Sequence, residues 1–175
     1  MVINLSLKGK RIAIFAGREF EDLELFYPYY RLIEEGAEVK VLAMRKESIA
    51  GKHGLKIMPD MLVSEANPNV FDCLIIPGGW APDRLRRYPE VIDFTKKMFE
   101  LNKLIAAICH GPQILISANI LKGKRVTCVS AIKDDVINAG ATYVDEPVVR
   151  DGNIITSRVP RDLPAFCREI IKALK

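Results

Sequence analysis

The sequence contains none of the long apolar runs that place a protein in a membrane. No stretch of its 175 residues approaches the length of a membrane span. The segment Met1–Lys10 alternates apolar and charged residues and lacks the uninterrupted apolar core of a signal peptide. We therefore expect a protein of the cytoplasm that has no membrane partner.

The sequence contains no C-x-x-C pair of cysteines. The four cysteines are widely separated, at Cys73, Cys109, Cys128 and Cys167. This spacing argues against a zinc ribbon and a dithiol redox motif, and it favours a reducing compartment. We expect neither a metal ion nor another cofactor.

Three further absences argue against other classes of protein. The net charge of +4 comes from Lys and Arg scattered among carboxylates, without a basic run interleaved with aromatics, so no specific nucleic-acid partner is expected. No G-x-G-x-x-G follows the first predicted strand, which disfavours a nucleotide-dependent oxidoreductase. No histidine follows His110, which disfavours the triad of a class I glutamine amidotransferase.

Apolar runs and helical patterns alternate along the chain. Strands are predicted at residues 11–16, 38–43, 71–76, 104–108 and 125–129, and helices at 19–35, 89–101, 112–119, 133–139 and 160–175. Residues 44–61 indicate a loop or small hairpin, and residues 148–156 a hairpin that turns at Asp151-Gly152. This alternation predicts an α/β fold with a mainly parallel sheet. With 49% hydrophobic residues and no linker, we expect one domain over residues 1–175.

Five residues are expected to meet beyond the carboxyl ends of the strands, where open parallel sheets bind ligands. They follow the first, third and fourth predicted strands, at Glu21, Gly78, Gly79, Cys109 and His110. Together they supply a thiol, an imidazole, a carboxyl group and a glycine pair whose N–H groups can face a developing oxyanion. These groups are typical of nucleophilic catalysis.

Cys109 follows a predicted strand and precedes a predicted helix. The segment Ala107–Gly111 resembles the G-x-S-x-G nucleophile elbow, in which a strained turn projects the nucleophile from the sheet. A helix that begins just after the cysteine would also stabilise a thiolate. The alternative is a buried structural cysteine, which we predict for Cys73 and Cys128 in strands and for Cys167 in a helix.

Histidine occurs only twice, at His53 and His110. His110 can serve as the base for Cys109 only if the turn bends both side chains toward one cavity, which elbow turns allow. The alternative is a solvent-exposed histidine at a helix start. His53 lies in a mixed loop, where a turn residue is the simpler interpretation.

The carboxyl group comes from the acidic segment after the first strand. Glu21 is placed close to the predicted thiol, but Glu19, Asp22 and Glu24 belong to the same segment, and sequence position does not choose among the four. A carboxyl group beside a thiolate has its pKa raised by the like charge. It can then stay protonated, donate a hydrogen bond to sulfur and move protons during turnover.

With these residues placed, the chain resembles the PfpI intracellular-protease family of the DJ-one/PfpI superfamily over nearly its whole length. The motifs that carry the resemblance are Glu19-Phe-Glu-Asp-Leu-Glu24, Gly51-Lys-His-Gly54, Pro77-Gly-Gly79 with Ala81-Pro82, Ile108-Cys-His-Gly-Pro-Gln-Ile-Leu115, Ile132-Lys-Asp-Asp135, Asn138-Ala-Gly140 and Ser157-Arg-Val-Pro160. The resemblance implies a flavodoxin-like three-layer sandwich. Its nucleophilic cysteine, neighbouring histidine and nearby glutamate match Cys109, His110 and Glu21.

The resemblance also implies a site shared between the subunits of a dimer or a larger ring. In this family an acidic residue of the adjoining subunit orients the histidine, and the matching position here is Asp83, where a PfpI-type chain has glutamate. Trp80 and Val129 stand where such chains have arginine and tyrosine. Beside Gly78 and Gly79, Trp80 is a candidate substrate-binding residue that narrows the pocket.

The resemblance implies hydrolysis, in which Cys109 attacks a carbonyl, His110 handles the proton and Gly79 helps to hold the oxyanion. A peptidase and a deglycase acting on glycated protein both belong to this class. A second hypothesis is a glyoxalase, in which Cys109 adds to a small 2-oxoaldehyde and Glu21 moves a proton between its carbons to give a hydroxy acid. A third is a redox sensor based on an accessible thiol of low pKa.

Overall fold

The computed structural model describes residues 6–175, so half of the segment Met1–Lys10 lies outside the described residues. The strands are β1 (Arg11–Phe15), β2 (Glu38–Ala43), β3 (Ile49–Ala50), β4 (Lys56–Ile57), β5 (Met61–Leu62), β6 (Cys73–Ile76), β7 (Leu104–Ile108), β8 (Arg125–Val126), β9 (Thr142–Tyr143), β10 (Val148–Asp151) and β11 (Ile154–Ser157). The helices are α1 (Asp22–Glu34), α2 (Ala81–Leu85), α3 (Pro89–Glu100), α4 (Pro112–Ser117), α5 (Lys133–Asn138) and α6 (Leu163–Leu174). Short 3₁₀ helices cover Val63–Glu65, Pro68–Val70, Ser130–Ile132 and Pro160–Asp162.

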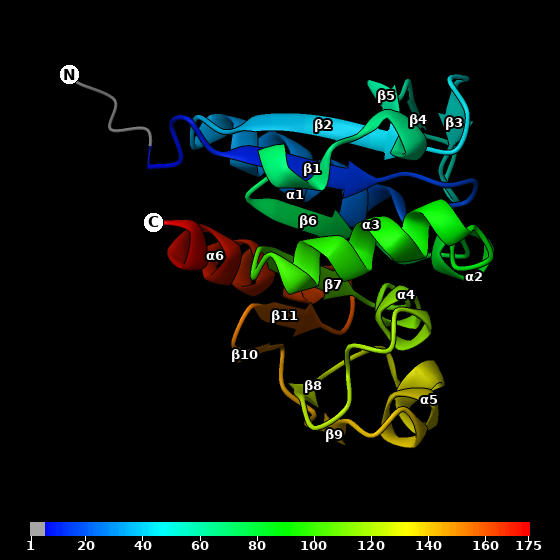
Figure 1. The fold of residues 1–175 in the computed structure, drawn as a ribbon, viewed down its shortest axis with the longest axis vertical. Helices are drawn as coiled ribbons and strands as arrows, with labels where there is room; N and C mark the ends of the chain where they lie inside the picture. The colour runs from blue at the N-terminus through cyan, green and yellow to red at the C-terminus, as the bar shows by residue number, and fades with distance from the viewer. Residues whose placement is uncertain (1–5) are drawn as a thin grey trace.

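The main sheet has seven strands in the order β10-β11-β7-β6-β1-β2-β5 (Figure 1). All neighbours pair in parallel except the β10–β11 hairpin, which is antiparallel. The predicted α/β fold with a mainly parallel sheet is therefore confirmed. Two small two-stranded sheets, β3–β4 and β8–β9, lie outside the main sheet.

Helices cover both faces of this sheet. Helices α1 and α6 pack on each other, whereas α3 packs on β6 and β7 and contacts α4. Figure 1 shows α3 in front of the sheet and α1 behind it. Strands β6 and β7 are buried along their whole length, which explains why their sequences are continuous apolar runs. The arrangement is the flavodoxin-like three-layer sandwich that the family resemblance implies.

One predicted strand is shorter in the structure, and one helix of the structure was not predicted. The strand expected over residues 125–129 covers only Arg125–Val126, and it pairs with β9 in a separate small sheet. Cys128 is therefore buried in a loop instead of a strand. Helix α2 is not among the predicted elements, because five residues with a proline near the start leave too short a pattern to recognise.

The strand order reverses between β1 and β6. The chain leaves β1 for β2 on one side of the sheet and leaves β6 for β7 on the other, so the loops after β1 and β6 diverge. Such a reversal leaves a crevice beyond the carboxyl ends of the strands, where α/β proteins bind ligands. The two loops touch through an isolated antiparallel bridge between Phe20 and Gly79.

Candidate active site

Cys109 lies in a strained turn directly after β7. Its backbone φ is +62°, in the left-handed region that residues with a side chain rarely adopt. The Cys109 N–H donates to the Ser157 carbonyl at 3.0 Å, and the Cys109 carbonyl accepts from the Val129 N–H at 3.2 Å. Gly111 is required next to it, because a Cβ there would lie 2.4 Å from the Ile76 carbonyl oxygen. The strained strand-to-helix turn predicted from sequence is present.

The other three cysteines are core residues. Cys73, Cys128 and Cys167 each expose no more than 1% of their surface, and burial raises the pKa of each thiol. Only Cys109 is partly accessible, and all four thiols are free. The structure therefore distinguishes one cysteine from three structural ones, as the sequence predicts.

Three kinds of group surround the Cys109 sulfur. His110 Nδ1 lies 3.4 Å from Sγ, so the turn does bend both side chains toward each other. The backbone N–H groups of Gly79 and His110 face the sulfur, and the Glu24 carboxyl group lies close enough to shift the pKa of the thiol; within the described residues, its buried Oε1 has no hydrogen-bond partner. Donors from two loops and one helix therefore converge on the thiol.

Glu24 is the carboxyl group that lies beside the thiol. Its side chain is completely buried on α1, and its Oε2 accepts a 2.8 Å hydrogen bond from the Gly78 N–H. Burial raises the pKa of Glu24 to about 8; the Gly78 hydrogen bond opposes this shift, and the negative charge of Glu21 adds to it. Glu24 is therefore predominantly protonated at neutral pH, and its proton is available to the sulfur.

The expectation that Glu21 supplies this carboxyl group is corrected by the geometry. Glu21 precedes the first residue of α1, and its carboxylate turns to the hairpin loop, where it pairs with Lys52 Nζ and His53 Nε2, each at 3.2 Å. Glu24, three residues later and inside the helix, carries its side chain to the sulfur instead. The physical reason is the helix start, because only residues inside α1 share its buried face.

The pKa of the Cys109 thiol depends on the state of Glu24. Burial and then the negative charge of Glu24 raise the pKa of Cys109 to about 12, whereas the N–H groups of His110 and Gly79 lower it. When Glu24 carries its proton, the repulsion between the two groups disappears and a donor faces the sulfur. The thiolate therefore forms most readily while Glu24 is protonated.

His110 is neutral in this environment. Burial, followed by the positive charge of Lys52, lowers the pKa of His110 below its usual value. A neutral imidazole can accept a proton, so this state suits a base for the adjacent thiol. The only side-chain hydrogen-bonding contact that His110 makes among residues 6–175 is the one with Cys109.

The β3–β4 hairpin borders the site and is tied to the start of α1. The buried Asp22 carboxylate accepts hydrogen bonds from the backbone N–H groups of His53 and Leu55, each at 2.8 Å. Gly51 permits this close approach, since a Cβ there would lie 2.4 Å from Asp22 Oδ2. His53 is thus a turn residue, as predicted, and it also pairs with Glu21.

The glycine pair after β6 fits between Cys109 and the acidic segment after β1. A Cβ on Gly78 would lie 2.7 Å from both the Cys109 Cβ and Glu24 Oε2, so only glycine fits there. Gly79 has φ +76° and its backbone approaches Glu19 and Glu21 just as closely. The two glycines therefore lie against the thiol, where the sequence places them.

Trp80 and Asp83 follow the glycine pair at the surface. Trp80 is 56% exposed, and its ring centroid lies 6.0 Å from that of His110. Asp83 lies on α2, where its carboxylate pairs with Arg87 at 2.9 Å. In the part of the chain that the structure describes, Asp83 makes no hydrogen bond or ion pair with His110 of the same subunit.

The DJ-1/PfpI family profile matches residues 10–173, which is nearly the whole chain. The chain belongs to the DJ-1/PfpI family. The resemblance inferred from separated motifs is therefore confirmed.

Curated relatives in the DJ-1/PfpI family are similar over their full length. A deglycase of Pyrococcus abyssi is 52% identical over 165 residues, covering 94% of this chain and 99% of the relative. The deglycase PfpI of Pyrococcus furiosus is 49% identical with the same coverage. YraA of Bacillus subtilis, named as a candidate cysteine protease, is 43% identical over 95% of this chain and 99% of its own.

Solved structures of DJ-1/PfpI proteins share the fold. A two-domain protein of Anabaena variabilis, with a DJ-1/ThiJ/PfpI-like domain and a ferritin-like domain, superposes with a TM-score of 0.93 at 45% identity. The match covers 94% of this chain and 48% of that one. DJ-1beta of Drosophila melanogaster gives a TM-score of 0.90 at 28% identity, covering 95% of this chain and 90% of the other.

One site residue of this DJ-1/PfpI chain, Glu24, is not singled out by the sequence. The helical pattern contains a signal that could have found it, because Leu25, Pro28 and Leu32 define the buried face of α1 and Glu24 falls on the same stripe. Lys52, whose charge reaches both His110 and Glu24, has no such signal. It comes from a hairpin loop 57 residues before Cys109, and only the fold brings the two together.

Proposed function

We propose that this chain is a PfpI-type cysteine hydrolase, a deglycase or peptidase, with Cys109 as its nucleophile. The observation that carries the proposal is the convergence of a protonated buried carboxyl group, two backbone N–H donors and a neutral imidazole on one strained, partly accessible thiol. Relatives that are about 50% identical in sequence and are named deglycases support the same class of reaction.

The geometry suggests how each group takes part. The Cys109 sulfur attacks the carbonyl carbon of the substrate, and the thiol proton passes to neutral His110, which lies 3.4 Å away. The N–H groups of Gly79 and His110 face the position where the oxyanion develops. His110 then returns the proton to the leaving amine, and water releases the acyl group from sulfur.

A glyoxalase is the second candidate, and the raised pKa of Glu24 specifically favours it. A carboxyl group with a pKa of about 8 can both donate and accept a proton near neutral pH. After the Cys109 thiol adds to the aldehyde of a 2-oxoaldehyde, Glu24 can remove the proton from that carbon and deliver it to the neighbouring one. In this reaction Glu24 takes the role expected of Glu21.

A redox sensor has less support. That hypothesis needs an accessible thiol of low pKa, whereas Cys109 is half-buried and burial raises its pKa. Oxidation of Cys109 is still compatible with an enzyme as a side reaction.

The proposal includes the partners and the compartment inferred from the sequence. The substrate classes are peptides, glycated proteins and small aldehydes, and self-association brings Asp83 of one subunit toward His110 of another. None of the helices within residues 6–175 has the length and apolar character needed to cross a membrane. The cytoplasm is the proposed location, without a specific nucleic-acid partner.

The decisive experiment measures three activities on the same samples. Purified wild-type, Cys109→Ala and Cys167→Ala proteins are assayed for release of methylglyoxal adducts from a glycated peptide, cleavage of a fluorogenic peptide and lactate formation from methylglyoxal. Cys109→Ala should lose at least about 100-fold in rate, whereas Cys167→Ala, which alters a buried core thiol, should retain activity.

The pattern of activities separates the candidates. Deglycation or peptide cleavage that depends on Cys109 supports the hydrolase, and lactate formation alone supports the glyoxalase. Full turnover by Cys109→Ala in any of the assays would eliminate Cys109 as the nucleophile of that reaction.

A further inference from the structure

A cleft with a volume of about 540 Å³ lies beyond the carboxyl ends of β1 and β2. Residues after β1, the loop from β2 to β3, and helix α2 form its walls. None of the residues gathered around Cys109 lines it. It is therefore separate from the residues around Cys109.

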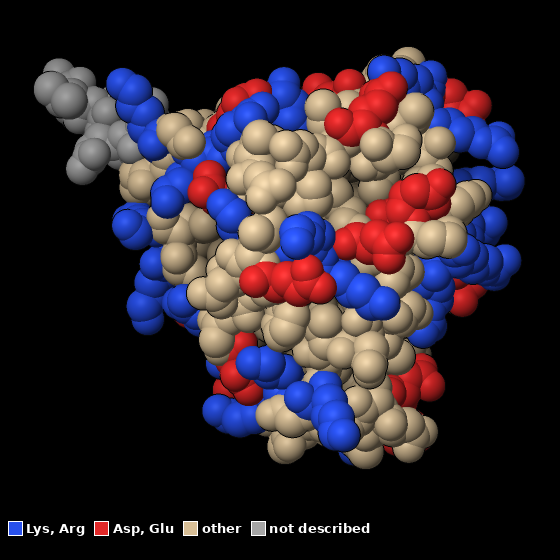
Figure 2. All heavy atoms as spheres, in the orientation of Figure 1, with Lys and Arg blue, Asp and Glu red and all other residues tan. Residues whose placement is uncertain are grey.

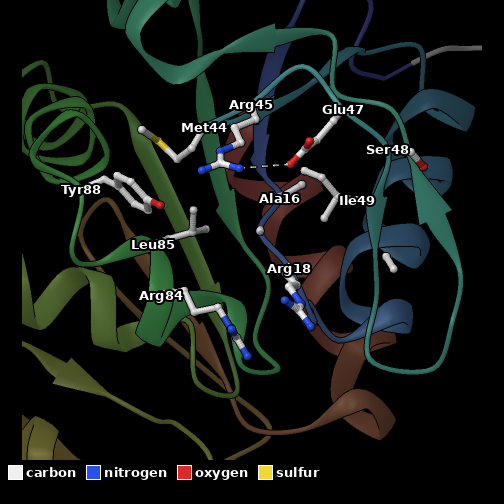
Figure 3. Close-up of a pocket in the computed structure, with 12 residues that line it drawn as sticks. Ala16, Arg18, Met44, Arg45, Glu47, Ser48, Ile49, Arg84, Leu85 and Tyr88 are labelled. Atoms are coloured by element: carbon white, nitrogen blue, oxygen red, sulfur yellow. Dashed lines mark ion pairs between the residues drawn. The ribbon is translucent and has the colours of Figure 1, made fainter.

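Three arginines from three different segments line this cleft (Figure 3): Arg18, Arg45 and Arg84. Figure 3 shows Arg45 on one side of the cleft and Arg18 and Arg84 on the opposite side. Glu47 is the one acidic residue in the lining, so positive charge exceeds negative charge there. Figure 2 shows Lys and Arg gathered along the same edge of the molecule, near β3 and α2.

The three arginines differ in their internal ion pairs, and Arg18 has none within the described residues. Arg45 and Glu47 are 3.9 Å apart, at the outer limit of an ion pair, and Arg84 pairs with the Glu19 carboxylate. Arg18 forms no ion pair or side-chain hydrogen bond with any residue in the described range 6–175. Its guanidinium group therefore keeps its donors for an anion from solution.

The rest of the lining is apolar, with one tyrosine. Leu85 and Ile49 form parts of the wall, and Tyr88 points its hydroxyl group into the cleft (Figure 3). Leu85 is fixed in place because it packs on Gly17, where a Cβ would lie 2.9 Å from Leu85 Cγ. Such a surface suits the organic body of a ligand, and the tyrosine hydroxyl can donate to its polar end.

We propose that this cleft binds a small phosphate monoester with an apolar or aromatic body. Guanidinium groups bind phosphate oxygens in pairs through charge-assisted hydrogen bonds, and a dianion can engage more than one arginine at once. The apolar wall then contacts the organic group. Binding in this cleft does not involve Cys109, so this proposal does not depend on the proposed hydrolase function.

Isothermal titration calorimetry with phenyl phosphate at a fixed salt concentration of about 0.15 M tests the site. Wild-type protein should bind one phenyl phosphate per chain, more tightly than it binds inorganic phosphate, phenol or benzoate. Arg18→Gln and Arg84→Gln should each weaken binding by about tenfold or more, because each removes a charge-assisted contact. Circular dichroism should show that both variants keep the native fold.

Two control variants locate the ligand. Arg168→Gln removes an exposed arginine on α6 and should leave affinity unchanged. Cys109→Ala should also bind normally, because the cleft is separate from the active site. Absence of saturable binding, equal affinity in Arg18→Gln and wild type, equal affinity for benzoate, or loss of binding in Cys109→Ala would each overturn the proposal.

Discussion

Glu24 and Cys109 behave as one coupled pair. The raised pKa of Glu24 comes first from burial, and the raised pKa of Cys109 comes first from burial and then from the charge on Glu24. Each group therefore loses its proton most easily while the other retains one. Between about pH 8 and about pH 12 this coupling leaves one proton to share between the carboxyl group and the thiol.

The coupling predicts the pH dependence of thiol alkylation. The iodoacetamide rate of wild-type protein should flatten above about pH 8, because ionised Glu24 then suppresses the thiolate. In Glu24→Gln the rate should continue to rise, so that the variant reacts about tenfold faster one pH unit above that point. The measurement is the second-order alkylation rate between about pH 6 and pH 10, with Cys109→Ala as the blank.

Glu21→Gln is the matched control for this prediction. It removes a carboxylate from the same segment that pairs with Lys52 and His53 and does not contact the thiol. Its rate profile should follow that of wild type. A wild-type profile that continues to rise steeply well above the pKa of Glu24 would contradict the assignment of this residue as the neighbour of the thiol.

At the scale of the element, the start of α1 arranges both the site and the hairpin beside it. Asp22, the first residue of the helix, holds the β3–β4 turn, and Glu24 reaches the thiol from the same helical turn. Lys52, in that hairpin turn, lowers the pKa of His110 and pairs with Glu21. The start of α1 therefore positions Glu24 directly and Lys52 through the β3–β4 hairpin.

Asp22→Ala should release the hairpin. The substitution removes two hydrogen bonds to a buried carboxylate, each worth about 1.5–3 kcal/mol in comparable cases, and leaves the His53 and Leu55 N–H groups without their acceptor. Hydrogen–deuterium exchange of residues 49–57 should accelerate strongly, while exchange in β7 stays slow. Asp22→Asn retains one acceptor oxygen, so its exchange rate in residues 49–57 should lie between those of wild type and Asp22→Ala. Unchanged exchange in Asp22→Ala would disprove the role of Asp22 in holding the hairpin.

At the scale of the whole molecule, burial of Glu24 makes stability depend on pH. The pKa of Glu24 rises from an ordinary value of 4.5, which applies to the unfolded chain, to about 8 in the folded protein. Between these two values the folded state keeps a proton that the unfolded state has lost. The contribution of Glu24 to stability is therefore greatest below the unfolded-state pKa and falls as the pH rises toward the folded-state pKa, above which it no longer changes.

Urea unfolding of wild type and Glu24→Gln between about pH 5 and pH 8 checks this prediction. The free energy of unfolding of wild type should fall relative to the variant by up to about 1.4 kcal/mol per pH unit. Protein concentration is held constant, since self-association would also contribute to stability. Parallel curves for the two proteins would show that Glu24 ionises normally in the folded state.

Assembly is the remaining question at this scale, and Asp83 provides the test. If Asp83 orients His110 across an interface, Cys109→Ala and Asp83→Ala subunits should each be nearly inactive alone but recover activity when co-assembled. Mixed assemblies then contain sites in which an intact Cys109 and an intact Asp83 come from different chains.

Arg87→Gln is the control for this test. It removes the arginine that pairs with Asp83 within the subunit but keeps the Asp83 carboxylate, so its activity should stay close to that of wild type. Wild-type activity in Asp83→Ala alone would refute a shared site.

The sequence by itself determined most of the main elements and the thiol that we propose as the nucleophile. The apolar runs of β1 and β7 predicted those strands almost residue for residue, because strands buried on both faces are nearly continuously apolar. β2 was predicted with the same bounds, although its first half alternates exposed or half-buried charged residues with buried apolar ones. Cys109 followed from its place between a strand and a helix start, next to His110 and Gly111. Both the strands and the turn at Cys109 depend on residues that are adjacent in the chain, so the sequence alone is enough to recognise them.

Only the tertiary structure decided which carboxyl group lies beside the Cys109 thiol. The acidic segment after β1 offers four candidates within six residues, and the choice between Glu21 and Glu24 depends on where α1 begins and which way its buried face points. The same holds for Lys52 and for the cleft lined by three arginines, whose residues come from separate segments. These residues come together only when the strands and helices pack, so their spacing in the sequence does not predict that they are close.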